Sequence, residues 1–186
     1  GKLGEEHVLP FETPAYHSAL VKPDNNNAQP PDSAPTAGAM NTGVKKRFNL
    51  INLNENAIHD DCSTVAGNEL TPFSEIVSGM DKSVGVVSTA RLTHATPAAV
   101  HAKTANRNWE DPVPEGCTPQ ADIATQLLDA MEAATVDLAT GGGCPHLAPA
   151  RAARNVFGGR RPAQVNPLQL PPGSASRLQP STPEPR

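Results

Sequence analysis

The chain has 186 residues, enough for one domain with a substantial core, but its composition argues against a complete, well-packed core. Hydrophobic residues make up 37% and aromatic residues only 3%, while the 20 prolines are about twice the average share. The net charge of −4 argues against a nucleic-acid-binding protein, which would normally show a basic face. No apolar run approaches the roughly 18 residues of a membrane helix, so we predict neither a nucleic-acid partner nor a membrane span.

The start of the chain reads as loops followed by a short helix. Its first residues, GKLGEEHVLPF, have neither a basic n-region nor an apolar h-region, so we predict no signal peptide in this chain. Residues 1–31 are rich in proline and predict loops, with one strand near residues 17–21. The small residues from Asp32 to Thr42 then predict a helix that ends at Gly43.

Asp32 and Ser33, at the start of that helix, have two interpretations. An aspartate before a helix is commonly its N-cap, and a serine after it is then an ordinary first-turn residue. The alternative is a carboxylate beside a nucleophilic hydroxyl. The local sequence alone leaves both open.

The middle of the chain predicts alternating helices and strands. Residues 48–53 alternate enough for a strand, residues 60–64 read as a loop, and the apolar spacing predicts a helix from about 68 to 80. Residues 84–89 are an apolar, β-branched run typical of a parallel sheet. Because a strand follows a helix at this distance, we predict an α/β fold.

A ligand site is expected just beyond the strand at 84–89, because open α/β sheets bind ligands at the carboxyl ends of their strands. His94 and Thr96 lie there. Each also has a structural interpretation: His94 as a loop histidine that makes a hydrogen bond, and Thr96 as an N-cap before Pro97. A helix over about 98–106 then leads to Arg107.

The later part of the domain predicts one regular helix and a final strand. An acidic, proline-rich loop over 110–119 precedes a helix at 121–133, whose apolar side chains share one face. Residues 136–139 predict a strand, and the glycines at 141–143 predict a turn rather than a phosphate-binding loop. Three widely spaced cysteines argue against a zinc cluster; one disulfide with one thiol and three buried thiols fit the spacing equally well.

Residues 144–186 differ in character from the rest. They contain nine of the 20 prolines, six arginines, no lysine and a single acid, Glu184. Without an apolar period such a tract cannot offset its ordering entropy, so we predict a partial domain over 1–143 and a disordered tail over 144–186. The tail's composition also resembles out-of-frame translation of a GC-rich gene, a hypothesis that an in-frame source locus would refute.

Several motifs in register closely resemble the alkaline phosphatase family, in its bacterial and animal forms. They are PDSAPTAGAMNTGVK at 31–45, DCSTVAGNEL at 61–70, KSVGVVSTARLTHATPAA at 82–99, AKTANRNWED at 102–111, DIATQLLDAM at 122–131 and VDLATGGG at 136–143. Their order and most of their spacings agree with the family over residues 1–143. The resemblance implies part of a three-layer sandwich around a central, mostly parallel β-sheet.

The resemblance also implies roles for five residues. Ser33 matches the serine that attacks phosphorus, becomes phosphoserine and contacts a zinc ion. Asp32 matches the neighbour that holds an arginine, and Arg107 matches that arginine, whose fork clamps two phosphate oxygens. Thr96 matches a ligand of the magnesium site, and His94 matches the position beside it that tunes the metal preference of that site.

The activity implied by the family is phosphomonoester hydrolysis with two zinc ions and one magnesium ion. The family also implies a homodimer in the periplasm or outside the cell. Cys62 and Cys117 match a disulfide pair of its animal-type members. Smaller departures from the family are Pro35 and Gly38, which stand where a small residue and a threonine are usual.

The larger departure concerns the metal ligands. The first metal-binding aspartate of the family lies upstream of residue 1, and most other ligands lie beyond the triple glycine, where this chain has its tail. We therefore predict a fragment with little or no phosphatase activity. The alternatives are an inactive phosphate- or metal-binding remnant and an unstable product without a function of its own.

Overall fold

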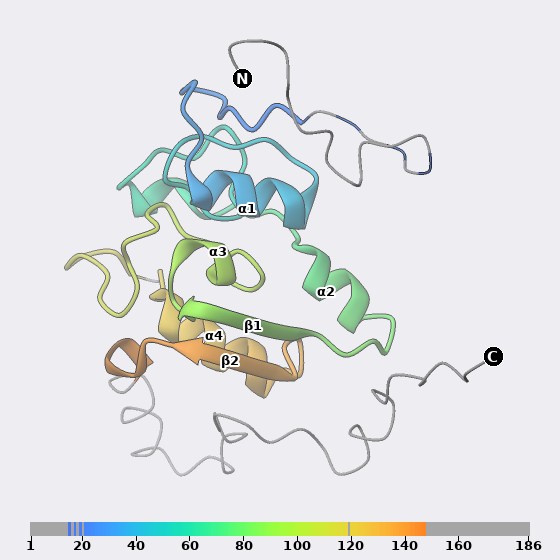
Figure 1. Ribbon diagram of the computed structural model, residues 1–186. Coiled ribbons are helices and arrows are strands. Elements are labelled where there is room, and N and C mark those ends of the chain that lie inside the picture. Colours follow the sequence, from blue (N-terminus) through green and yellow to red (C-terminus); the bar gives the residue numbers. More distant parts are fainter. Residues whose placement is uncertain (1–14, 16, 18, 20, 119, 148–186) are drawn as a thin grey trace, which may run out of the picture.

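The computed structural model describes residues 15, 17, 19, 21–118 and 120–147. Figure 1 shows a two-stranded sheet, with α1 and α3 stacked above it and α2 at one end. In chain order the elements are α1 (Ser33–Thr42), a 3-10 helix (Cys62–Thr64), α2 (Phe73–Ser78), β1 (Gly85–Arg91), α3 (Ala95–Ala98), α4 (Ile123–Glu132) and β2 (Leu138–Gly142). Within this described part, no helix is long and apolar enough to cross a membrane.

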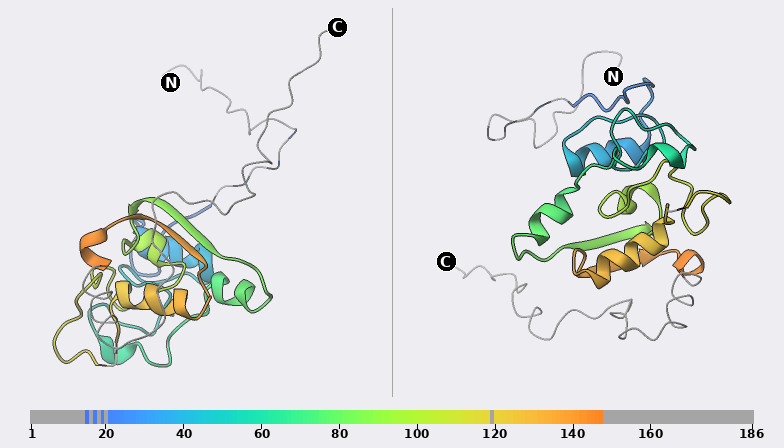
Figure 2. Two further views of the ribbon diagram at one scale, coloured as in Figure 1. Left: turned by 90° about the horizontal axis from the view of Figure 1, so that it is seen from below. Right: turned by 180° about the vertical axis from the view of Figure 1, so that it is seen from behind.

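The two strands form a parallel pair, which confirms the predicted α/β class. Gly85 lies opposite Leu138 and Val86 opposite Ala139. Parallel strands need a crossover connection, and here the chain passes through α3 and α4 between β1 and β2. Figure 2 shows α4 running along this sheet.

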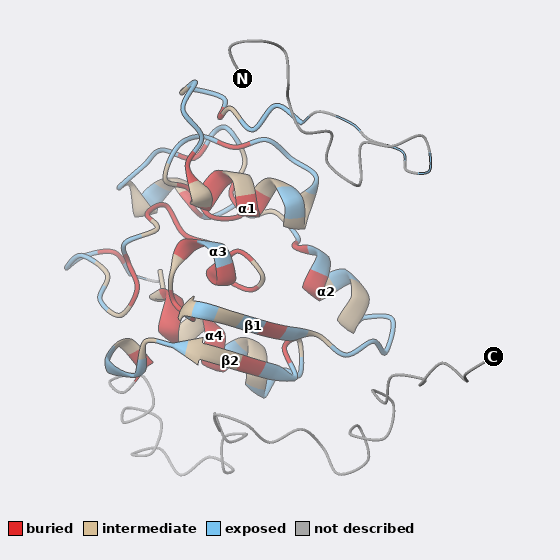
Figure 3. Cartoon of the chain, viewed as in Figure 1, coloured by how far each residue is buried: buried red, intermediate tan, exposed pale blue. Residues whose placement is uncertain are grey.

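Three clusters of buried side chains hold these elements together (Figure 3). The first joins α1 to α3 through alanines, whose small side chains let the two helices approach closely: Ala34, Ala37, Ala95 and Ala98. The second surrounds the 3-10 helix: Leu50, Leu53, Trp109 and Cys117. The third packs α4 onto one face of the sheet: Val86, Ala124, Leu127 and Ala139.

Two helices form where the sequence predicts them. α1 ends at Gly43, and α4 begins after Asp122, whose side chain accepts a hydrogen bond from the Thr125 N–H at 2.6 Å. The helix predicted over 68–80 is shorter, because Pro72 stands at its N-cap and Leu70 instead donates its N–H to the Asn52 carbonyl at 2.9 Å. β1 agrees with the strand predicted over 84–89.

Three other predictions of secondary structure are wrong. Residues 48–53 form no strand, because Asn49 and Asn52 adopt positive φ angles of 67° and 48° and leave only isolated bridges. The helix predicted over 98–106 ends at Ala98, because Thr104 pairs with Ile51 instead. Residues 17, 19 and 21 form no strand either, while residues 18 and 20 lie outside the described part.

The triple glycine is mostly strand rather than turn. β2 extends through Gly141 and Gly142, and Gly142 lies opposite Arg91 at the end of β1. A Cβ at Gly141 would lie 2.9 Å from Leu92 Cδ2, so only glycine allows this close approach. Residues 144–147 then form a helical turn with Leu147 buried, in contrast to the predicted disorder; residues 148–186 of the predicted tail lie outside the described residues.

Candidate functional site

Asp32 stands at the N-cap position of α1, yet its side chain does not cap the helix. One carboxylate oxygen accepts a hydrogen bond from Arg107 Nη1, and the other accepts the backbone N–H of Asn49 at 2.9 Å. The Asp32 side chain is only 6% exposed, so this ion pair is largely removed from water. Of the two interpretations of Asp32, the structure therefore favours the carboxylate that holds an arginine and not the helix N-cap.

Ser33, the first residue of α1, lies at the same guanidinium. Its hydroxyl oxygen accepts a hydrogen bond from Arg107 Nη1 at 2.7 Å. One nitrogen of Arg107 thus contacts both the carboxylate of Asp32 and the hydroxyl of Ser33. Two residues that are neighbours in sequence and a third that lies more than seventy positions away form one cluster.

Arg107 reaches this position along an extended segment and not along a helix. Thr104 and Ile51 exchange backbone hydrogen bonds at 3.1 Å each, and the Arg107 N–H donates to the Asn49 carbonyl at 3.0 Å. These bonds fix the backbone of Arg107 beside the loop that follows α1. Its side chain keeps 19% of its surface exposed, so Arg107 is not fully buried.

His94 joins the cluster from the start of α3. Its Nε2 lies 3.1 Å from Arg107 Nη2, and because an arginine can only donate, this nitrogen must be the unprotonated acceptor of a neutral imidazole. The pKa of His94 is lowered, first by burial and then by the positive charges of Arg107 and Arg91. The protonation state and the contact therefore agree.

Thr96 occupies a different place from the one that its N-cap interpretation predicts. His94 is the N-cap of α3, and Thr96 is the second residue of the helix, with an exposed side chain. The hydrogen bonds that join Asp32, Ser33, His94 and Arg107 do not include Thr96. The structure thus brings four of the five candidate residues into one hydrogen-bonded cluster.

The metal sites that the resemblance implies do not fit the described residues by themselves. No group of three or more His, Cys, Asp or Glu side chains in that part of the chain is placed to hold a metal ion. The single lone pair of His94 Nε2 points to Arg107, and Ser33 Oγ already accepts one hydrogen bond from Arg107, which leaves it one further lone pair. Thr96 is exposed and supplies a single hydroxyl.

The cysteines divide into one bridge and one thiol. Cys62 and Cys117 form a disulfide with a Cα–Cα distance of 5.6 Å, and Cys144 is free and exposed. The disulfide lies in the buried cluster that also holds Trp109, two residues beyond Arg107. It therefore supports the segment that carries the arginine.

Sequence reasoning missed two residues that support the site. The sequence pattern predicts a strand at Asn49, although asparagine tolerates the left-handed conformation that this residue adopts. Glu110 falls in the predicted acidic loop, but its carboxylate is buried and accepts hydrogen bonds from Arg91 Nε at 2.9 Å, Arg91 Nη2 at 2.6 Å and Thr93 Oγ1 at 2.5 Å. A glutamate beside a buried tryptophan was the signal available.

The fold and the cluster define an α/β protein whose polar site, built on a serine and an arginine, lies beyond the carboxyl end of a parallel strand. A family profile described as alkaline phosphatase matches residues 1–163. The chain belongs to the alkaline phosphatase family.

Two relatives illustrate how much of such a protein is present. The chain is 38% identical over 153 residues to the tissue-nonspecific isozyme of alkaline phosphatase from Gallus gallus, and 37% identical over 153 residues to the isozyme from Homo sapiens. Each alignment covers 78% of this chain and 28% of the relative. The chain thus spans little more than a quarter of the length of the relatives it matches.

Solved structures of similar fold are also alkaline phosphatases. The enzyme from the Antarctic bacterium TAB5 aligns with a TM-score of 0.55 at 22% identity, over 73% of this chain and 35% of that one. A mutant of the TAB5 enzyme with Mg bound in its M3 site aligns with a TM-score of 0.56 at 23% identity, over 74% and 33%. The Thermus thermophilus enzyme aligns with a TM-score of 0.52 at 26% identity, over 73% and 26%. These alignments support the predicted partial alkaline-phosphatase-like fold.

Proposed function

We propose that this chain binds the phosphoryl group of phosphate monoesters at Ser33 and Arg107, as part of an alkaline phosphatase that hydrolyses them. The observation that carries the proposal is the contact of Arg107 Nη1 with both Asp32 and Ser33 Oγ. A guanidinium presents its donors in one plane and can hold two phosphate oxygens at once. Asp32 fixes the guanidinium from one side, which leaves the Ser33 side for the phosphoryl group.

The reaction implied for Ser33 is a transfer in two steps. The Ser33 oxygen forms a bond to phosphorus while the ester P–O bond breaks, and the alcohol leaves with the proton of the serine hydroxyl. Water then breaks the phosphoserine bond, releases inorganic phosphate and restores the hydroxyl. Arg107 would stabilise negative charge on the non-bridging oxygens in both steps.

The two zinc ions and one magnesium ion implied by the family remain a prediction for this protein. Because the described residues do not fit a metal site by themselves, we derive no step through a metal. An unactivated serine hydroxyl is a poor nucleophile, so we propose that this chain alone gives little or no turnover. A homodimer and a periplasmic or extracellular location are likewise proposals from the family.

Phosphate binding tests the proposal directly. We expect saturable shifts in NMR spectra of the chain on titration with inorganic phosphate. Arg107→Lys should weaken this binding roughly tenfold or more, because lysine lacks the planar fork. Arg47 is exposed and takes no part in the hydrogen bonds that join Asp32, Ser33, His94 and Arg107, so Arg47→Lys is a matched control with the same change of side chain. Equal weakening by both substitutions would contradict the proposal.

A second candidate function is that of a phosphate-binding remnant without turnover. The lack of a metal-binding group among the described residues favours it. A turnover assay separates the two functions. The assay is phosphate release from an aryl phosphate at alkaline pH with zinc and magnesium added, beside Ser33→Ala. We expect no difference between the two proteins. Activity that disappears in Ser33→Ala would show that the chain completes its own catalytic site.

A further inference from the structure

Asn49 has a backbone conformation that few residues adopt. Its φ of 67° lies in the left-handed region. Residues with a Cβ are strained there, glycine is not, and asparagine is among the best tolerated of the others. It is half-buried in the loop after α1. Such conformations persist only where the surrounding structure favours them.

The backbone of Asn49 contacts both charged residues of the candidate site. Its N–H donates to Asp32 Oδ2 at 2.9 Å, and its carbonyl accepts the N–H of Arg107 at 3.0 Å. The other oxygen of Asp32 accepts from the Arg107 guanidinium, so the three residues close a ring of hydrogen bonds. Rotation about φ turns the carbonyl relative to the N–H, so a negative φ would break at least one of the two backbone contacts.

The side chain of Asn49 takes no part in this ring. Its Nδ2 lies 3.2 Å from Nε2 of His59, on the exposed surface. The backbone and the side chain of Asn49 therefore contact different groups. This separation allows one substitution to remove the side chain and another to disturb the backbone.

We propose that Asn49 is a positioning residue, whose left-handed backbone sets the Asp32 carboxylate and the Arg107 guanidinium in place to receive a phosphoryl group. The proposal rests on the function proposed above for Ser33 and Arg107. It makes the conformation of Asn49, and not its amide group, the property that matters. Glycine can replace it, and a residue with a Cβ and no affinity for the left-handed region cannot.

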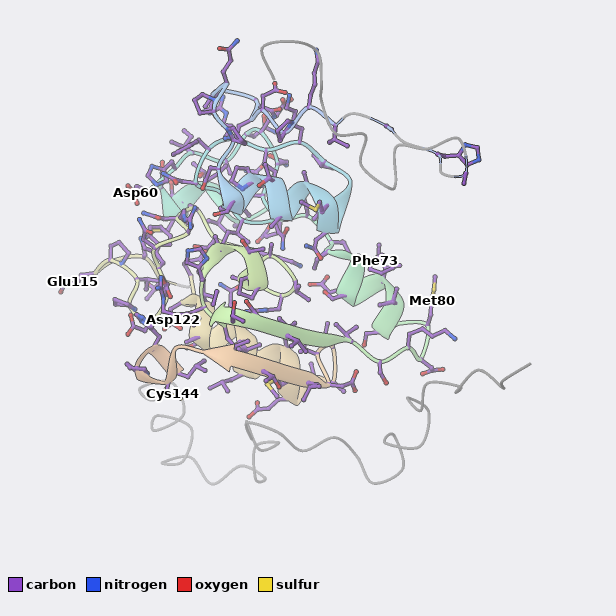
Figure 4. The ribbon with its side chains drawn as sticks, in the orientation of Figure 1. Asp60, Phe73, Met80, Glu115, Asp122 and Cys144 are labelled. Atoms are coloured by element: carbon purple, nitrogen blue, oxygen red, sulfur yellow. A yellow bond between two sulfur atoms is a disulfide. The ribbon has the colours of Figure 1, made fainter. Side chains whose placement is uncertain are left out.

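The test compares Asn49→Gly and Asn49→Ala with the same pair of changes at Asp81. Asp81 has a φ of 55° and follows α2, so alanine is strained at both positions and glycine at neither. Its neighbour Met80 lies across the molecule from Asp60, which is next to His59 (Figure 4). The Asp81 pair thus measures the effect of backbone strain away from the site.

The first readout is the affinity for inorganic phosphate from NMR titration. We expect Asn49→Ala to weaken binding about tenfold and Asn49→Gly to stay within about twofold of the parent chain. Both Asp81 variants should bind like the parent, although Asp81→Ala and Asn49→Ala should lower the unfolding midpoint similarly. Equal effects of Asn49→Gly and Asn49→Ala on affinity, or equal losses in the two alanine variants, would overturn the proposal.

The second readout needs no ligand. The guanidinium N–H signals of Arg107, assigned by their loss in Arg107→Lys, report whether Asp32 holds the side chain. We expect these signals in the parent chain, in Asn49→Gly and in both Asp81 variants, and their collapse toward the position of a free arginine in Asn49→Ala. If the parent binds no phosphate, the proposed function fails, while an unchanged Arg107 signal in Asn49→Ala would refute the role of Asn49.

Discussion

Lys46 is a buried cation at the carboxyl end of α1. Its side-chain nitrogen donates to the carbonyls of Gly38 at 3.0 Å and Val44 at 2.9 Å, and to the Thr42 hydroxyl. A Cβ at residue 38 would lie 2.8 Å from Lys46 Cε, so the glycine that departs from the family pattern makes room for this lysine. Burial lowers the pKa of Lys46 from 10.5 to about 8.

This lysine predicts a dependence of stability on pH. Between pH 8 and 10.5 the unfolded chain binds more protons at Lys46 than the folded chain, because the folded pKa is the lower one. Below pH 8 the buried amine is charged, and its burial lowers the free energy of unfolding by the full amount. This destabilisation disappears as the pH rises from 8 to 10.5. The free energy of unfolding should therefore rise by up to about 3 kcal/mol across this window.

Urea unfolding at several pH values measures this effect. The rise should be absent in Lys46→Met and present in Lys45→Met, whose exposed lysine pairs with Asp24 at 2.6 Å. Parallel pH curves for the parent chain and Lys46→Met would show that the buried amine is not the cause. Comparison between variants removes the contribution of other groups that titrate in alkaline solution.

Glu110 joins the end of β1 to the start of α4. Its carboxylate accepts hydrogen bonds from Nε and Nη2 of Arg91, and its backbone carbonyl accepts one from the N–H of Ala124 at 2.9 Å. Burial by itself would raise the pKa of Glu110, but the hydrogen bonds from Arg91 and Thr93 outweigh burial and hold the pKa below its usual range. The folded protein therefore favours the ionised carboxylate.

We expect Glu110→Gln to lower the free energy of unfolding by about 2 kcal/mol at neutral pH, because hydrogen bonds to a buried charge are lost. The difference from the parent chain should shrink as the solution falls below the ordinary glutamate pKa of 4.5, where the unfolded carboxyl is already protonated. Asp111→Asn is the control, since Asp111 is less buried and pairs only with His146 among the ion pairs described. A pH-independent difference would contradict this account.

The disulfide constrains the segment between the 3-10 helix and the loop that precedes α4. Cys62 and Cys117 are 55 positions apart, and closing a loop of this length in the unfolded chain is worth up to about 4 kcal/mol in the chain-entropy view. Replacing both cysteines by serine should lower the free energy of unfolding by a comparable amount. Cys144→Ser should leave the free energy of unfolding unchanged, because this thiol is free and exposed. It also lies well away from Asp60, which is two residues before Cys62 (Figure 4).

Chemical unfolding with and without a thiol reductant measures the same quantity. The parent chain and Cys144→Ser should both lose stability in reductant, while the double serine variant should not respond. A large response of the double variant would mean that the reductant acts through something other than this bridge. The comparison needs no assumption about activity.

At the scale of the whole molecule, the sheet has one covered face and one open face. Val86 packs against α4, whereas Val87 on the opposite face is 76% exposed and Leu138, which lies opposite Gly85, is 43% exposed. Phe73, the first residue of α2, and Met80, two residues beyond its last residue, are also exposed to solvent (Figure 4). The described sheet has two strands, and the chain spans 28% of its relatives, so much of the family fold lies beyond what is described.

The two faces predict opposite outcomes for neighbouring substitutions. Val86→Ala should lower the free energy of unfolding by about 2 kcal/mol, because it opens a cavity against α4. Val87→Ala should change it by less than about 0.5 kcal/mol, since the side chain is already in water. Equal losses at the two positions, measured by urea unfolding, would show that the exposed face is covered in solution, for example by a second copy of the chain.

Elements that depend on neighbouring residues can be predicted from the sequence. α4 follows from apolar residues at helical spacing, α1 from small residues that end at a glycine, and β1 from a β-branched run. Family motifs also pointed to Asp32, Ser33, His94 and Arg107, because their order in the chain is specific. These signals act over a few residues or over motifs in register.

The conformation of Asn49, the partners of Asp32 and the path of the chain before Arg107 depend on contacts between distant segments, which the local sequence does not show. Asn49 turns left-handed where alternation predicts a strand, and residues 98–106 leave the helix to pair with Ile51. The side chain of Asp32 does not cap α1 and instead accepts a hydrogen bond from Arg107, 75 positions away. In each case a hydrogen bond between distant segments outweighs a local preference. Such a preference is worth about 1 kcal/mol, and it contains no information about the distant contact that outweighs it.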